Sequence, residues 1–128
     1  MSQRRFFITV TVVSMLLLLP AIQGFDNGVY NQASGCGCHS QTGTTPASVS
    51  ISGLPNAYDV NKLYQVTVSV SGGVQGSSGG FSFEVDKGTL STGMGLMLVK
   101  VNNQGNSATH TITGSSYRSW SFEWTSPA

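Results

Sequence analysis

Two segments of the chain alternate apolar and polar side chains with a period of two residues, and this alternation constrains the fold more than any other feature. The apolar positions are Tyr64, Val66, Val68 and Val70 in the first segment and Trp120, Phe122 and Trp124 in the second. Successive side chains of an extended chain point to opposite faces, so each segment predicts a β-strand with one face on a core. Trp120 and Trp124 are expected in that core rather than on a binding platform, because they share a face with Phe122.

Shorter extended segments accompany these two strands, and turns rich in Gly, Asn and Ser connect them. We expect further strands at residues 47–52, 80–85, 88–90, 94–101 and 108–113. Glycine occupies 16 of the 128 positions and charged residues make up only 9% of the chain, a composition poor in helix formers. The pattern predicts an all-β fold, a two-sheet antiparallel β-sandwich over residues 47–128.

Only Ser126, Pro127 and Ala128 follow the second aromatic strand in the sequence. Two interpretations stay open, a minimal sandwich or a domain that lacks terminal strands. In the second case an open sheet edge at residues 120–124 would invite pairing with another chain, so we expect any self-association to use sheet edges.

The N-terminal residues have the composition of a secretory signal. Arg4 and Arg5 precede an apolar run at residues 6–19, which Pro20 and a small-residue region ending at Gly24 follow. These are the basic, apolar and polar parts of a signal peptide, so residues 1–24 are expected to be removed on export. The run is shorter than the roughly 20 residues that cross a bilayer, and an uncleaved anchor is the alternative and the only expected membrane contact. The protein is therefore expected to be secreted, extracellular or on the cell surface, with residues 25–46 as an irregular arm.

The charge that remains after loss of the leader excludes two classes of partner. Residues 25–128 contain four basic and five acidic side chains, which gives a net charge of −1. A nucleic-acid-binding domain needs a basic footprint, and binding to anionic lipid needs a basic cluster or a basic amphipathic helix. Neither feature is present in the sequence, so we expect no nucleic acid partner and no lipid-surface partner.

The order of short motifs along residues 34–128 resembles a known family. The motifs are Cys36-Gly37-Cys38-His39, Val49-Ser50-Ile51-Ser52-Gly53-Leu54-Pro55, the strand after Tyr64, Gly79-Gly80-Phe81, Gly88-Thr89-Leu90, Thr109-His110-Thr111 and Trp120-Ser121-Phe122-Glu123-Trp124-Thr125-Ser126-Pro127. In this order they are similar to the choice-of-anchor V domains of secreted and surface-anchored microbial proteins, which are distantly similar to reeler domains. The resemblance implies an extracellular, immunoglobulin- or reeler-like sandwich. Similar proteins commonly space their cysteines as Cys-x-x-Cys-His and continue beyond the last strand.

The Cys36-Gly37-Cys38-His39 motif contains the residue types that hold haem c. Two thiols add to the haem vinyl groups and the following histidine ligates iron, usually with the spacing Cys-x-x-Cys-His. Two thiols one residue apart point to opposite sides of an extended chain, so the shorter gap requires an unusual turn. Gly35 and Gly37 tolerate positive φ and would permit that turn.

His39 and His110 are the two histidines of the chain. If haem c is bound, we expect His39 as the proximal iron ligand and His110 as the sixth ligand, while an ordinary strand histidine remains the alternative for His110. Ligation by two histidines suits electron transfer, because no coordination position stays open. Met94 and Met97 are weaker candidates for the sixth position, and the apolar run around them favours the core for both.

Three other interpretations of the cysteines stay open. A disulfide, within the Cys36–Cys38 pair or between molecules, suits an oxidising compartment. Two cysteines and two histidines also make a tetrahedral zinc set, although structural zinc sites usually separate their cysteines by two to four residues. The third interpretation is that the motif holds nothing.

The sequence favours a binding or carrier protein over an enzyme. Glu84 and Asp86 flank a turn, where carboxylates are normally solvated, and His110 has no identifiable acidic partner for a catalytic triad. We therefore expect a small secreted or cell-surface electron-transfer protein with covalent haem c and a redox partner. The alternative is an extracellular adhesion or structural module that binds a cell-surface protein and whose cysteines form a disulfide.

Overall fold

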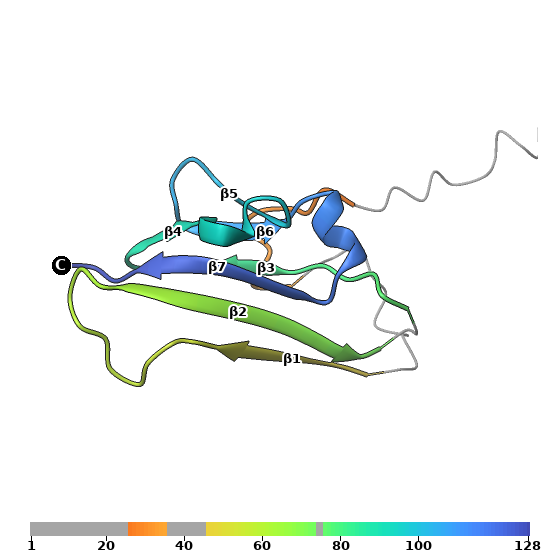
Figure 1. The fold of residues 1–128 in the computed structure, drawn as a ribbon, viewed down its shortest axis with the longest axis horizontal. Coiled ribbons are helices and arrows are strands. Elements are labelled where there is room, and N and C mark those ends of the chain that lie inside the picture. The colour runs from red at the N-terminus through yellow and green to blue at the C-terminus, as the bar shows by residue number, and fades with distance from the viewer. Residues whose placement is uncertain (1–25, 36–45, 74–75) are drawn as a thin grey trace, which may run out of the picture.

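The computed structural model describes residues 26–35, 46–73 and 76–128, and it confirms the all-β sandwich (Figure 1). In this part of the chain the strands are β1 (Ala47–Ser52), β2 (Leu63–Gly72), β3 (Ser82–Glu84), β4 (Thr89–Ser91), β5 (Val99–Val101), β6 (Ser107–His110) and β7 (Ser119–Thr125). They form a four-stranded sheet in the order β1-β2-β7-β4 and a three-stranded sheet in the order β3-β6-β5. All neighbouring strands are antiparallel.

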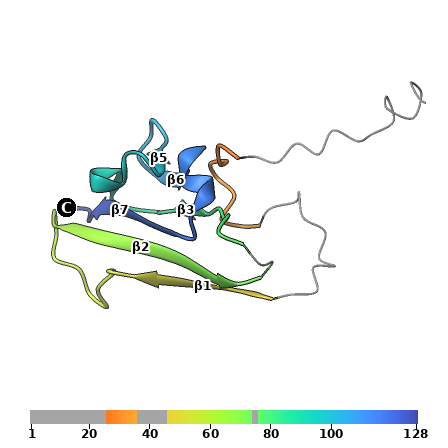
Figure 2. The same ribbon diagram turned by 45° about the vertical axis from the view of Figure 1, so that its right-hand side comes forward.

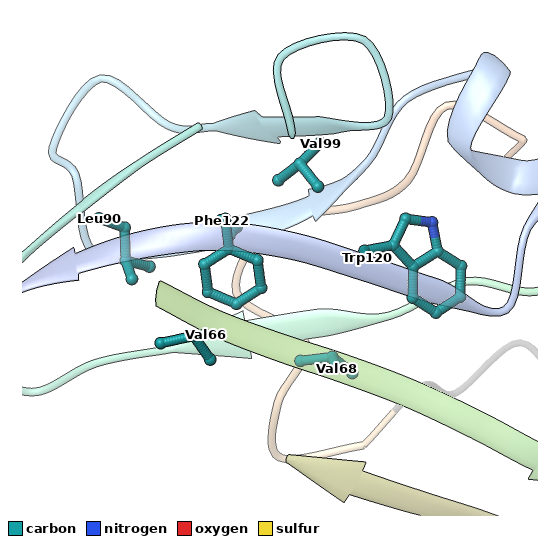
Figure 3. Close-up of a cluster of buried hydrophobic side chains, with 7 residues drawn as sticks. Val66, Val68, Leu90, Val99, Trp120 and Phe122 are labelled. Carbon is teal, nitrogen blue, oxygen red and sulfur yellow. The ribbon is translucent and has the colours of Figure 1, made fainter. Parts of the chain in front are cut away.

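The two alternating segments form the centre of the core, as their period predicts. β2 and β7 lie side by side, with Val66 opposite Phe122 and Val68 opposite Trp120. These four side chains are almost completely buried, together with Val99 and Ala108 of the facing sheet (Figure 3). Trp120 is therefore a core residue, and its indole Nε1–H donates to the backbone oxygen of Gly114 at 2.9 Å. A buried indole N–H needs such a partner.

Phe81 and Phe83, which flank the start of β3, complete the core from the second sheet. The Phe81 ring stacks on Phe122 at 5.7 Å and the Phe83 ring meets Phe122 edge-on at 5.1 Å. These are the offset and edge-to-face arrangements that aromatic pairs prefer. Phe122 thus joins the two sheets.

The expected strand at residues 94–101 is wrong in its first half. A 3₁₀ helix, η1 (Gly93–Gly95), occupies that half, and only Val99–Val101 is extended. A Cβ added at Gly95 would overlap the backbone oxygen of Ser121, so glycine lets this turn pack closely against β7. Met94 is 95% exposed and Met97 75% exposed, so the expected core position of both side chains is also wrong.

The expected strand at residues 108–113 is shorter than its apolar pattern suggested. β6 ends at His110, and a second 3₁₀ helix, η2 (Thr113–Ser116), follows. The Thr111 hydroxyl donates to the backbone oxygen of Met97 at 2.7 Å and accepts from the Gly114 amide at 3.0 Å. Thr111 thereby fixes the turn that ends the strand.

The edge expected to be open at residues 120–124 is paired with β4 at Glu123 and Trp124. β7 pairs with β2 on one side and with β4 on the other, so it is an inner strand of the four-stranded sheet. β1 and β4 are the edges of that sheet, and β3 and β5 are the edges of the other. Among the described residues, none belongs to a helix long and apolar enough to span a membrane.

We predict that Phe122→Ala lowers the free energy of unfolding by about 3–5 kcal/mol, because the substitution removes a ring that contacts both sheets and leaves a cavity. Urea unfolding monitored by tryptophan fluorescence measures the loss. Ser119→Ala is the control on the exposed face of the same strand, and it should cost about 0.5 kcal/mol. Equal losses for the two variants would contradict the central place of Phe122.

Candidate functional site

Residues 26–35, which we call the strap, lie across the outer face of the three-stranded sheet. The backbone N–H groups of Asn31, Gln32 and Ala33 donate to side chains of that sheet. Their acceptors are the Ser107 hydroxyl at 3.0 Å, the Ser82 hydroxyl at 3.1 Å and the Glu84 carboxylate at 2.8 Å. Three successive amides are thus satisfied by one sheet face, which orders a segment that has no secondary structure of its own.

The strap makes the outer face of β6 part of the interior. Ser107 and Thr109 have no exposed surface, although their side chains point away from the core between the sheets. Gly28 has a φ of +57°, and a Cβ at this position would overlap the Thr109 hydroxyl. Glycine therefore permits both the backbone conformation and the close approach.

Tyr30 and Lys100 attach the strap to β5. The Lys100 ammonium lies 5.1 Å from the centre of the Tyr30 ring and 3.4 Å from the backbone oxygen of Gly28. Burial raises the pKa of the Tyr30 phenol above its ordinary value. The strap therefore crosses the sheet from β5 at Tyr30 to β3 at Ala33.

Both flanks of the cysteine motif reach the same end of the sandwich (Figure 2). On one side the Gly35 amide donates to the backbone oxygen of Gln32, which is held at the first residue of β3. On the other side Pro46 accepts from the Gly73 amide at 2.9 Å, just before β1 begins. Cys36, Cys38 and His39 themselves lie outside the described residues.

His110, the other expected ligand, is at this same end but points into the core. It is 8% exposed, and its ring lies 6.3 Å from the Trp120 ring and 6.4 Å from the Phe81 ring. A Cβ at Gly80 would lie 2.6 Å from the His110 Cε1 atom, so the loop before β3 closes over the ring. Phe81, Trp120 and the backbone at Gly80 therefore lie around the imidazole ring.

The Phe81 backbone amide contacts one nitrogen of the His110 ring. The Phe81 backbone N–H donates to Nδ1 at 3.3 Å. Because a backbone N–H only donates, Nδ1 is the acceptor in this contact. A histidine binds a metal through an unprotonated nitrogen, and Nδ1 already accepts from the Phe81 amide. Ligation of iron by His110 stays a prediction.

The remaining expected ligands and acids are dispersed. Met94 and Met97 are exposed on and after η1, while Glu84 holds the strap and Asp86 lies exposed in the turn after β3. Within the described ranges, no group of three or more His, Cys, Asp or Glu residues is placed to hold a metal ion. The role of Glu84 as a strap anchor has no signal in the local sequence, since its partner is 51 residues away.

No family model, curated protein or solved structure matches the chain. The resemblance to choice-of-anchor V domains rests on the sequence motifs.

We predict that Gly28→Ala loosens the strap and lowers the free energy of unfolding by at least about 1 kcal/mol, because the new Cβ meets the Thr109 hydroxyl at a positive φ. The direct measurement is amide hydrogen exchange, which should accelerate at Asn31, Gln32 and Ala33. Gly76→Ala is the control, since Gly76 also has a positive φ but nothing lies within 4 Å of its added Cβ. Unchanged exchange in Gly28→Ala would show that the strap does not depend on this contact.

Proposed function

We propose that this protein is an exported β-sandwich that displays the Cys36-to-His39 motif at one end and carries haem c there as a small electron-transfer protein. The observation that carries the proposal is the placement of the motif's two flanks. Gln32 is held at the start of β3 and Pro46 precedes the start of β1, so the folded domain anchors the segment on both sides at one end.

The residues proposed to hold the group are Cys36 and Cys38 through thioether bonds and His39 through iron. Haem c supplies one-electron chemistry by cycling between ferric and ferrous iron. The sandwich supplies the scaffold, with a net charge close to zero and a rigid aromatic core directly behind the anchored end. A redox partner at the cell surface or outside the cell completes the proposed role.

His110 is assigned a structural part in this proposal. Its Nδ1 satisfies the Phe81 amide and its ring packs beside Trp120. Ligation of iron through Nδ1 would require loss of that hydrogen bond. The proposal therefore depends on His39 and leaves the sixth position of the iron to another group.

The second candidate is an extracellular adhesion or structural module in which Cys36 and Cys38 form a disulfide. The surroundings of His110 favour this candidate, since its ring is 8% exposed and its Nδ1 already accepts from the Phe81 amide. An exposed apolar strand at the margin of the sandwich also suits a module that binds other chains.

The first prediction of the proposal concerns the mass and colour of the exported protein. We expect an intact mass that exceeds the polypeptide by one haem, with Soret and α/β bands, when the chain is made in a host with a cytochrome c maturation system. Cys36→Ser and Cys38→Ser should each remove a thioether bond, and the double variant should lose all covalent haem. A colourless protein two protons lighter than the reduced chain would reject haem c and select the disulfide module.

The second prediction tests whether His110 ligates the iron. We expect His110→Ala to lower the unfolding free energy by about 1–3 kcal/mol, because the Phe81 amide is left unpaired in the interior. The positions of the Soret and α bands should stay unchanged. A shift of those bands to a high-spin spectrum in His110→Ala, with the fold retained by circular dichroism, would show that His110 does reach the iron.

A further inference from the structure

β1 is the one strand of the four-stranded sheet whose residues are all exposed. It pairs with β2 along its whole length, from Ala47 opposite Gly72 to Ser52 opposite Thr67, and its other edge has no strand partner in the described chain. Val49 is 65% exposed and Ile51 51% exposed. β1 is thus a regular strand that is hydrogen-bonded to β2 on one side, and no strand of the described residues pairs with its other side.

The exposed apolar side chains of β1 belong to the face of the sheet that forms the core. Val49 lies opposite Val70, and Ile51 lies opposite Val68, which is 3% exposed. Residues opposite one another in an antiparallel pair project from the same face. The core face is therefore covered at β2 and uncovered at β1, because the facing sheet has one strand fewer.

The facing sheet also has a free edge on this side of the molecule. β5 lies near β4 and β7, so the order β3-β6-β5 places β3 toward β2 and β1. β3 pairs with β6 and, among the described strands, with no other. The four-stranded sheet therefore extends beyond the three-stranded sheet on this side, with β1 uncovered and β3 as the edge of the shorter sheet, a feature that we call the step.

We propose that a second copy of this chain covers the step. A step of this shape is complementary to itself under a two-fold rotation, so that β1 of each copy packs face to face on β1 of the other. Val49 and Ile51 of the two copies then bury one another, and each β1 comes to lie beside the free β3 edge of the other copy. A two-fold contact uses the same patch on both copies, which this arrangement satisfies.

Charge and exposed apolar surface support this occupant. β1 consists of Ala, Ser, Val, Ser, Ile and Ser, so two copies meet without a like-charge pair. Val49 is 65% exposed and Ile51 51% exposed, so the contact removes apolar surface of both copies from water. With two large apolar side chains from each copy, the dimer is expected to form reversibly.

The competing dimer pairs the two β1 edges side by side, and Ser50 distinguishes it from the face-to-face form. In an antiparallel edge pair that sets Val49 against Ile51, the two Ser50 residues meet on the two-fold axis, where lysines would repel. In the face-to-face form Ser50 points to the outer face of its own sheet, away from the second copy. The face-to-face form therefore tolerates a lysine at this position.

The test is analytical ultracentrifugation of the exported chain from about 1 μM to 1 mM, with Ile51→Lys and Ser50→Lys as a matched pair on opposite faces of β1. We expect a concentration-dependent dimer for the unmodified chain and for Ser50→Lys, with dissociation constants within about threefold of each other. Ile51→Lys should raise the dissociation constant at least about a hundredfold, since burying an unpaired ammonium is costly. Tryptophan fluorescence and the unfolding midpoint verify that both variants are folded.

Three outcomes would overturn the proposal. A monomer over the whole concentration range would show that the step is covered by something other than a second copy. Dissociation by Ser50→Lys as strong as by Ile51→Lys would select edge pairing. A dimer that Ile51→Lys leaves intact would place the contact elsewhere on the molecule. A disulfide between molecules would also give a dimer, so the series is repeated under reducing conditions, which leave a contact through β1 intact. The outcomes then do not depend on whether the cysteine motif holds haem.

Discussion

The pairing of β2 with β7 is the contact on which the rest of the structure depends. These two strands are far apart in the sequence, and their register aligns Val66 with Phe122 and Val68 with Trp120. A one-residue slip would turn every one of these side chains to the outer face, where Thr67 and Ser121 now bond one another at 2.9 Å. The native register therefore creates the apolar face on which the three-stranded sheet packs, and Phe81 and Phe83 contact Phe122 there.

The strap extends the same domain by a different physical means. It buries few apolar groups and is held through its own backbone, with three amides donated to side chains of β3 and β6. Such contacts replace hydrogen bonds to water, so each contributes about 1 kcal/mol, and together they place the segment before Cys36. A separate arm and a sandwich, as the composition suggested, are joined in residues 26–35 into one folded unit.

The proposed function and the proposed dimer use different parts of this unit. The motif enters and leaves at the end that holds His110, while the dimer uses the margin of the sheet along β1. The proposed dimer follows from the small size of the second sheet. The three strands of the smaller sheet cover the centre of the four-stranded sheet and bury His110, while the residues of β1 stay exposed. Because side chains fill the space between the two sheets, the surfaces left for partners are the end of the sandwich near the cysteine motif and the edge strand β1.

The amino-acid sequence by itself determined the fold class and the positions of the strongest strands, because a period of two residues is a local property that burial of one face preserves. It also named His110 and the cysteine motif by residue type. Only the tertiary structure decided that β7 is an inner strand, that Met94 and Met97 are exposed, that Ser107 and Thr109 are buried, and that the His110 ring faces Phe81 and Trp120. These outcomes depend on which distant segment covers a given face, and a local pattern of polar and apolar residues carries no information about that.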